Sequence, residues 1–268
     1  MKLGFIGGGN MAAALIGGLC RAGFQGGDIA VLDPSADRRQ ALAQAFGVQV
    51  EDQPGAWLAD LDLLVLAVKP QQMQAATRSV APWAGAVLSV AAGVRAADIA
   101  RWLGHEQVIR AMPNTPALIG AGVSGVAALP AAPAAARAAA TRVLETAGLV
   151  QWFEDETQLD AVTAISGSGP AYVFLFIEAL EAAAIELGLP ASAARQLAIA
   201  TVSGSARLAA ESLEAPAVLR ERVTSKGGTT AAALTRFEAE DLRGLVGRAA
   251  QAASARAAEL GDEFGRDA

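Results

Sequence analysis

The sequence places its first chemically informative residues in a glycine-rich turn after an apolar segment at residues 3–6. The spacing Gly7-x-Gly9-x-x-Ala12 begins directly after that segment. In such a turn the first glycine makes the tight bend, the second lets the backbone approach a pyrophosphate, and the third small residue lets a helix pack closely. We expect that helix to run from Asn10 to Arg21, with its positive N-terminal end facing the phosphates. The spacing therefore predicts a dinucleotide site.

Asp33 follows the second expected strand, Ile29–Leu32, and completes a βαβ unit with the turn. An acid at this position is expected to meet the ribose 2′-OH of the adenosine. Its charge would repel a 2′-phosphate and favour NADH, whereas Arg38 and Arg39, one helical turn on, could hold that phosphate and favour NADPH. The sequence leaves both NADPH and NADH open.

A second turn, at residues 224–230, combines glycines with hydroxyl side chains. We expect it to open a helix, so that the backbone N–H groups of Gly228, Thr229 and Thr230 form a cup for a carboxylate. Serine and threonine are also ordinary helix N-caps, so a plain cap remains an equal interpretation.

Small or proline-containing turns follow several other expected strands. Ligands of a doubly wound sheet bind at the carboxyl ends of the strands, so we expect these turns to line one crevice with the glycine-rich turn. They are Ala67-Val68-Lys69-Pro70, Ala91-Ala92-Gly93 and Met112-Pro113-Asn114-Thr115. Lys69 is interpreted equally well as a cofactor contact or as a solvated side chain. His105 precedes a strand and is expected to be ordinary surface.

The composition argues against several classes of protein. A net charge of −6 without a basic block argues against a nucleic-acid partner. Cys20 and His105 are the only residues of their types, which predicts no disulfide, no structural metal and a reducing cytoplasm. A secretory signal over Met1–Cys20 is disfavoured because glycines and Asn10 interrupt its apolar core.

The elements that must position these residues alternate between strand and helix in the first half of the chain. Apolar runs predict strands at the following positions: Leu3–Ile6, Ile29–Leu32, Leu61–Val68, Ala86–Val90, Gln107–Ala111, Val123–Ala127 and Val150–Phe153. We therefore predict an α/β, Rossmann-type, doubly wound domain at residues 1–160. Helical patterns alone follow, and they predict an all-α dimerisation and substrate-binding domain at residues 161–268.

The first long helix of that second half is unusually apolar. Its most apolar window, Ala171–Leu189, contains Glu178, Glu181 and Glu186, which would be costly in hydrocarbon and argue against a membrane span. Residues 172–177 are six apolar residues in a row, more than one small domain can cover. We expect a second subunit to cover them.

Five motifs occur in an order that resembles the pyrroline-5-carboxylate reductase family over nearly the whole chain. They are Phe5-Ile6-Gly7-Gly8-Gly9-Asn10-Met11, Ala67-Val68-Lys69-Pro70-Gln71, Arg110-Ala111-Met112-Pro113-Asn114-Thr115-Pro116, Ser166-Gly167-Ser168-Gly169-Pro170-Ala171-Tyr172 and Thr224-Ser225-Lys226-Gly227-Gly228-Thr229-Thr230. The last three are far more specific than the glycine-rich turn. Lys226 occupies a position that is commonly proline in the family.

The resemblance implies reduction of L-1-pyrroline-5-carboxylate to L-proline with NADPH or NADH, by an intertwined homodimer that often assembles into a decamer. The cofactor residues that we predict from it and from the strand ends are Gly7, Gly9, Asn10, Met11, Asp33, Ala67, Val68, Lys69, Pro70, Ala92, Gly93 and Asn114. The substrate residues that it implies are Ser225, Gly228, Thr229 and Thr230. We assign the catalytic role to Thr230, whose hydroxyl would orient the imine nitrogen.

The chemistry of the residues agrees with this resemblance. Reduction of a ring C=N bond needs a hydride donor against the carbon and a proton on the nitrogen, which water can supply. The alternatives are a related imine or β-hydroxyacid-type reductase and a nucleotide-binding regulatory module without chemistry. The intact turn at residues 224–230 argues against a regulatory module and against a β-hydroxyacid-type enzyme. The lack of a catalytic lysine on the first helix of the second half is a further argument against a β-hydroxyacid-type enzyme.

Overall fold

The computed structural model describes residues 1–81 and 83–266 and contains two compact units. The first unit comprises Met1–Ser168 together with the segment that begins at Ala252, and the second comprises Gly169–Gln251. This division differs from the predicted domains, 1–160 and 161–268. The first unit extends past residue 160 and also includes the end of the last helix.

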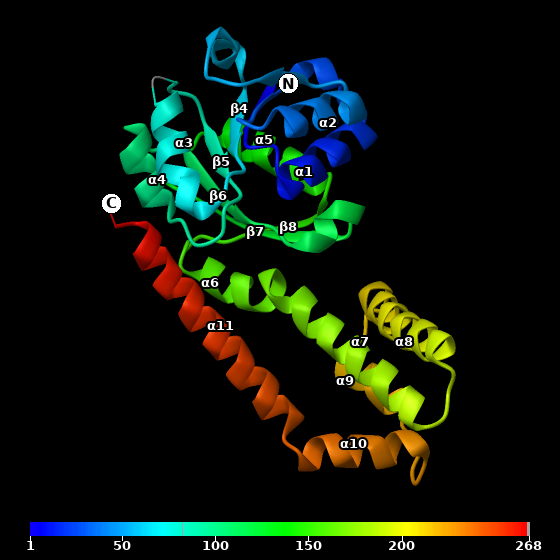
Figure 1. Cartoon of the computed structure of the whole chain (residues 1–268). Helices are drawn as coiled ribbons and strands as arrows, with labels where there is room; N and C mark the ends of the chain where they lie inside the picture. Colours follow the sequence, from blue (N-terminus) through cyan, green and yellow to red (C-terminus); the bar gives the residue numbers. More distant parts are fainter. Residues whose placement is uncertain (82, 267–268) are drawn as a thin grey trace. The chain divides into compact units, whose positions relative to one another are not determined.

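The first unit is built on a single sheet whose strand order is β3-β2-β1-β4-β5-β6-β7-β8 (Figure 1). Its strands are β1 Leu3–Ile6, β2 Ile29–Leu32, β3 Gln49–Glu51, β4 Leu63–Leu66, β5 Val87–Ser89, β6 Val108–Met112, β7 Gly122–Ala128 and β8 Gly148–Trp152. Neighbours from β3 to β6 pair in parallel. The order of these six strands is that of a dinucleotide-binding sheet, so the predicted Rossmann-type fold is confirmed.

Helices cover both faces of this sheet, because successive side chains of each buried strand point to opposite faces. Phe5, Val31 and Val65 belong to one core cluster, with residues of α1, α2 and α5. Leu64 and Leu66 belong to the other, with residues of α3 and α4. The bounds of these helices are α1 Asn10–Arg21, α2 Ala36–Phe46, α3 Met73–Val80, α4 Ala96–Leu103 and α5 Ala134–Glu145.

Two features of the sheet differ from the sequence prediction. The strand β3 was not predicted, because its residues are exposed or half-buried and form no apolar run. The strand β7 pairs antiparallel with β6 and parallel with β8. The β6–β7 connection contains the short 3₁₀ helix η4, Thr115–Ile119, and is too short for the helical crossover that a parallel pair requires.

The apolar helix expected around Ala171–Leu189 is part of a longer helical run. Helix α6, Gln158–Val162, passes into a π-helical turn, Thr163–Gly167, and then into α7, Gly169–Glu186. The Ser168 N–H donates to the Thr163 carbonyl, five residues back, at 2.8 Å. Pro170 has no N–H to continue the regular ladder, which explains why the hydrogen-bond pattern changes here.

The second unit is helical, as predicted. It contains α7, α8 Ala191–Glu211, α9 Pro216–Arg222, α10 Thr229–Ala239 and the first part of α11 Leu242–Phe264. The run Gln158–Glu186 is long and apolar enough to cross a membrane by length and composition alone. The side chains at residues 172–176 of α7 are exposed in the single chain, with Leu175 at 66%.

Candidate active site

A pocket of about 850 Å³ lies at the carboxyl ends of β1, β2 and β4 in the first unit. The predicted cofactor residues that line it are Gly7, Gly9, Asn10, Met11, Asp33, Ala67, Val68 and Lys69. Pro70, Ala92, Gly93 and Asn114 are not among its lining residues. The pocket also takes in residues 52–54, after the unpredicted strand β3, and residues of α3. Neither contribution has a local signal in the sequence.

The glycine-rich turn has the geometry that a pyrophosphate requires. Gly7 has a φ of +97°, and a Cβ there would lie 2.7 Å from the Ala67 carbonyl oxygen, so glycine is needed at this bend. A Cβ on Gly9 would meet no atom within 4 Å and would project into open space at the pocket. Gly9 is also the N-cap of α1 and makes no side-chain capping bond, which leaves the first N–H groups of the helix for an anion. These residues fit a dinucleotide phosphate.

Asp33 lies at the pocket, but its carboxylate is already bonded to the protein backbone. Its side chain is buried, and Oδ2 accepts a hydrogen bond from the Gly8 N–H at 2.8 Å. Oδ1 accepts one from the Ser35 N–H, also at 2.8 Å. The acid therefore ties the glycine-rich turn to the turn after β2. This role of Asp33 was not predicted, because it depends on the parallel pairing that sets Ile6 beside Leu32.

The two arginines that follow Asp33 have different environments. Arg38 lines the pocket, and its half-exposed guanidinium lies 3.6 Å from Asp33 Oδ2. Arg39 Nη1 instead donates to the backbone carbonyls of Asp33 and Pro34, at 2.7 and 3.1 Å. Of this pair, Arg38 is the one at the pocket.

The remaining predicted cofactor residues lie outside the pocket lining. Gly93 is buried at a φ of +74°, and a Cβ there would lie 3.2 Å from atoms of Leu260 and Phe264 in α11. Ala92 beside it is exposed, and Pro70 begins a 3₁₀ turn. The contacts predicted between Pro70, Ala92 or Gly93 and the cofactor stay predictions.

Asn114 and His105 are held by bonds within the protein. The Asn114 amide donates to the Ser166 carbonyl at 3.1 Å and accepts from the Val123 N–H at 3.0 Å, so it fastens the π-helical turn to the start of β7. His105 Nδ1 accepts from the Gln107 N–H at 3.3 Å, and His105 does not line the pocket. A cofactor contact by Asn114 stays a prediction.

The predicted substrate turn lies in the second unit, before α10. Gly228 is the N-cap of this helix and makes no side-chain capping bond, so the plain-cap interpretation has no hydroxyl cap to support it. The Gly228 N–H donates to the Ser225 carbonyl at 3.0 Å, and Gly227 makes the bend with a φ of +72°. The internal bond removes Gly228 from the expected cup. The N–H groups of Thr229 and Thr230 at the start of α10 remain.

Comparison with known proteins places these features in one family. A profile described as pyrroline-5-carboxylate reductase dimerisation matches residues 156–260, and one described as NADP oxidoreductase coenzyme F420-dependent matches residues 2–93. A pyrroline-5-carboxylate reductase of Pseudomonas aeruginosa is 44% identical over 99% of this chain and 98% of its own length.

Solved structures agree with this placement. The structure of a pyrroline-5-carboxylate reductase from Coxiella burnetii has a TM-score of 0.92 and 38% identity, covering 97% of this chain and 98% of that one. A Plasmodium falciparum pyrroline carboxylate reductase with NADP bound has a TM-score of 0.85 and 26% identity, with the same coverage. The chain belongs to the pyrroline-5-carboxylate reductase family.

Proposed function

We propose that the chain reduces L-1-pyrroline-5-carboxylate to L-proline, the last step of proline biosynthesis, with NADPH or NADH as hydride donor. Family membership supports this reaction. The observation that carries the choice of substrate is the turn before α10, whose first N–H groups have no side-chain cap. A carboxylate is the anion that pyrroline-5-carboxylate offers to such a turn.

The dinucleotide pocket supports the cofactor side of the proposal. The N–H groups at the start of α1 and the open space beside Gly9 would hold the pyrophosphate. When bound, the reduced nicotinamide supplies the hydride for the ring carbon.

The polar groups of the second unit have a positioning role in this proposal. The N–H groups of Thr229 and Thr230 would bind the substrate carboxylate. The Thr230 hydroxyl would orient the ring nitrogen, which lies two bonds from the carboxylate carbon. Water can protonate the weakly basic imine, so no strong general acid is needed.

Arg38 supports NADPH as the preferred cofactor. Both oxygens of Asp33 accept backbone hydrogen bonds, at 2.8 Å each, so this acid is less available to a ribose hydroxyl than we expected. Arg38 lines the pocket beside it and offers several N–H donors to a 2′-phosphate. The arginine thereby also offsets the repulsion between Asp33 and that phosphate.

The exposed apolar face of α7 supports an oligomer. Phe174 and Leu175 are 58% and 66% exposed in the single chain, and the dimerisation profile covers this helix. We propose a homodimer that buries them, assembled further into the decamer that the family resemblance implies. The glutamates at positions 178, 181 and 186 make a protein partner a better cover than lipid. Light scattering on the purified protein gives the size directly.

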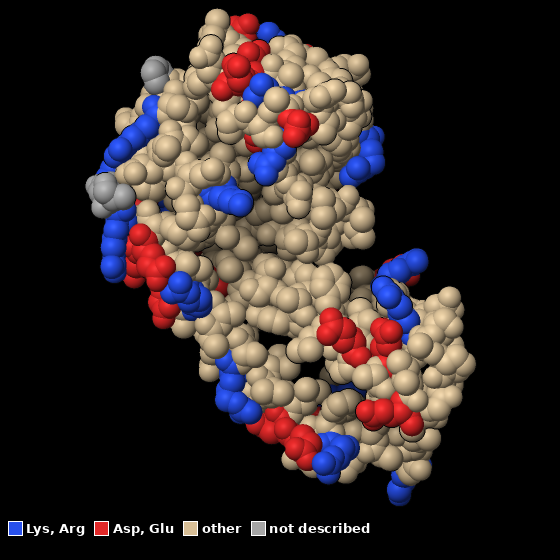
Figure 2. Space-filling view, viewed as in Figure 1, with Lys and Arg blue, Asp and Glu red and all other residues tan. Residues whose placement is uncertain are grey.

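The surface and composition support a cytoplasmic enzyme with a small-molecule substrate. Basic and acidic side chains are interspersed on the face shown in Figure 2. With a net charge of −6, this pattern does not resemble the basic footprint of a nucleic-acid-binding protein.

The experiment that tests the proposed function is a substrate-dependent assay of cofactor oxidation. Pyrroline-5-carboxylate should cause loss of the reduced-nicotinamide absorbance and yield one proline per cofactor oxidised. The control for the alternative reductase class is an acyclic β-oxo acid, which is the oxidised form of a β-hydroxyacid. Oxidation with that control and not with pyrroline-5-carboxylate would contradict the proposal.

A further inference from the structure

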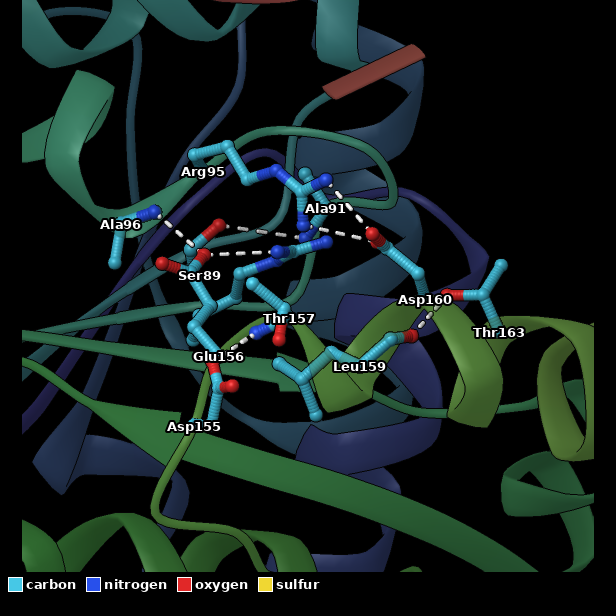
Figure 3. A network of polar contacts seen from close by, with 11 residues as sticks. Ser89, Ala91, Arg95, Ala96, Asp155, Glu156, Thr157, Leu159, Asp160 and Thr163 are labelled. Atoms are coloured by element: carbon cyan, nitrogen blue, oxygen red, sulfur yellow. Dashed lines mark hydrogen bonds and ion pairs between the residues drawn. The ribbon is translucent and has the colours of Figure 1, made fainter. Parts of the chain in front are cut away.

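Arg95 lies at the start of α4 and forms a two-pronged ion pair with α6. Its Nη1 and Nη2 donate to Oδ1 and Oδ2 of Asp160 at 2.9 and 2.7 Å (Figure 3). The Arg95 and Asp160 side chains are only 21% and 12% exposed. A bidentate pair of this kind fixes orientation as well as distance. Arg95 therefore holds α6 in a defined place on the first unit.

The same guanidinium group lies against the end of α11. A Cβ on Gly261 would lie 2.5 Å from Arg95 Nε and 2.8 Å from Nη2, so the absence of a side chain at Gly261 makes room for the arginine. The neighbouring Asp262 adds attraction. The pKa of Arg95 is raised chiefly by its hydrogen bond to Asp160, against a lowering by burial, with smaller contributions from the charges of Asp160, Glu156 and Asp262.

Glu156 fastens the segment before α6 next to this pair. Its Oε1 accepts from the Ala96 N–H at the start of α4 and from Arg110 Nη1 in β6, both at 2.8 Å. Arg110 is 1% exposed, so the contact is inside the fold. Figure 3 shows Glu156 beside Ala96 and Arg95 facing Asp160. The start of α4 is thus bonded to the chain at residues 156–160 through two carboxylates.

The position of these contacts along the chain gives Arg95 its significance. The second unit is one continuous segment, so the chain has two connections to it, after Ser168 and before Ala252. Asp160 precedes the first connection, with the π-helical turn between them, and Gly261 follows the second. Arg95 contacts both segments from within the nucleotide-binding unit.

We propose that Arg95 is a positioning residue for substrate binding. From its place between β5 and α4, it would hold in position the two chain segments that connect the first unit to the helical unit. The proposal rests on the proposed function, because the turn assigned to the substrate belongs to the helical unit. Arg95 does not line the dinucleotide pocket. Its loss should therefore weaken the use of pyrroline-5-carboxylate and leave cofactor binding intact.

The test compares Arg95→Met with Arg256→Met. Arg256 also pairs with carboxylates, Glu259 and Glu263 at 2.8 Å, but it does so within α11 alone, which makes it the matched control. For Arg95→Met we expect KM for pyrroline-5-carboxylate to rise about 10- to 100-fold, as for small misplacements caused by remote mutations. The dissociation constant for NADPH should change less than about 2-fold. Arg95→Lys, with one contact, should give an intermediate KM.

Hydrogen exchange provides a readout that does not depend on activity. Arg95→Met should speed amide exchange at residues 163–168 and 252–264, and Arg256→Met should not change residues 163–168. Gly261→Ala keeps the charge but fills the space of the guanidinium, so it should speed exchange at 252–264 even if Arg95→Met fails to fold.

Two results would overturn the inference. Unchanged exchange and KM in folded Arg95→Met would mean that the Arg95–Asp160 pair has no positioning role. A parallel loss of NADPH affinity would place the effect in the cofactor pocket. If wild-type protein does not reduce pyrroline-5-carboxylate, the proposed function fails, and the exchange data still decide whether Arg95 holds the two connections.

Discussion

The carboxylate of Asp33 accepts a hydrogen bond from the backbone N–H of Gly8 at 2.8 Å, inside the fold. This bond joins the two turns that border the dinucleotide pocket. It makes Asp33 a support for the phosphate-binding turn, and the ribose contact predicted for this acid stays a prediction. The charge of Asp33 is countered by Arg38, 3.6 Å away.

Asp33→Ala should weaken NADPH and NADH binding alike, by about 10-fold, and lower thermal stability. The Gly8 N–H is buried and would lose its acceptor, which costs about 1–3 kcal/mol. Calorimetric titration with each dinucleotide measures the effect, and Asp33→Asn, which keeps one acceptor oxygen, should be milder. A loss confined to NADH would instead support the direct ribose contact.

Arg38→Ala should lower kcat/KM for NADPH about 10- to 100-fold and change that for NADH little, since a charge-assisted hydrogen bond is worth about 1.5–3 kcal/mol. Arg39→Ala is the control, because that guanidinium donates to backbone carbonyls. Steady-state kinetics with both cofactors provides the comparison. Equal losses for the two cofactors in Arg38→Ala would argue against a 2′-phosphate contact.

Gly9→Val should abolish dinucleotide binding while the protein remains folded. A Cβ at this residue meets nothing within 4 Å, so the fold has room for it, but it would occupy the space of the pyrophosphate. Circular dichroism checks the fold and fluorescence titration checks binding. Wild-type affinity in a folded variant would show that the phosphates lie elsewhere.

Thr230→Ala should lower kcat/KM for pyrroline-5-carboxylate by roughly 10- to 1,000-fold, with fold and NADPH affinity retained, as expected for loss of one oriented polar contact. Thr230→Ser should recover most of the activity. Thr235→Ala is the control on the same helix, because its hydroxyl bonds to the Ala231 carbonyl at 2.9 Å. If Thr230→Ala matched the wild type, the turn would be only a helix start.

The parts of the fold with strong local signals were predictable from the sequence. Helix α1 has the predicted bounds, Asn10–Arg21, because the glycines before it and the periodic apolar residues within it are neighbours in sequence. The buried strands β2 and β4 likewise coincide with apolar runs. Local patterns of this kind carry most of a Rossmann-type unit.

The features that were missed depend on contacts between distant residues or lack a local pattern. Strand β3 is short and partly exposed, so it has no apolar signature. The role of Asp33 depends on which backbone N–H lies beside it, which is a matter of strand register. The closeness of Gly93 to Leu260 and Phe264, far along the chain, has no local pattern at the β5–α4 loop to signal it, and the cofactor contact predicted for Gly93 stays a prediction.

Isotope tracing can show whether the protein transfers a hydride to the ring carbon of pyrroline-5-carboxylate. The protein is incubated with the substrate and NADPH deuterated at both C4 positions, and the product is analysed by mass spectrometry. We expect proline with one deuterium, at the δ-carbon, in equal amount to the oxidised cofactor. Unlabelled proline, or cofactor oxidation without proline, would contradict this expectation.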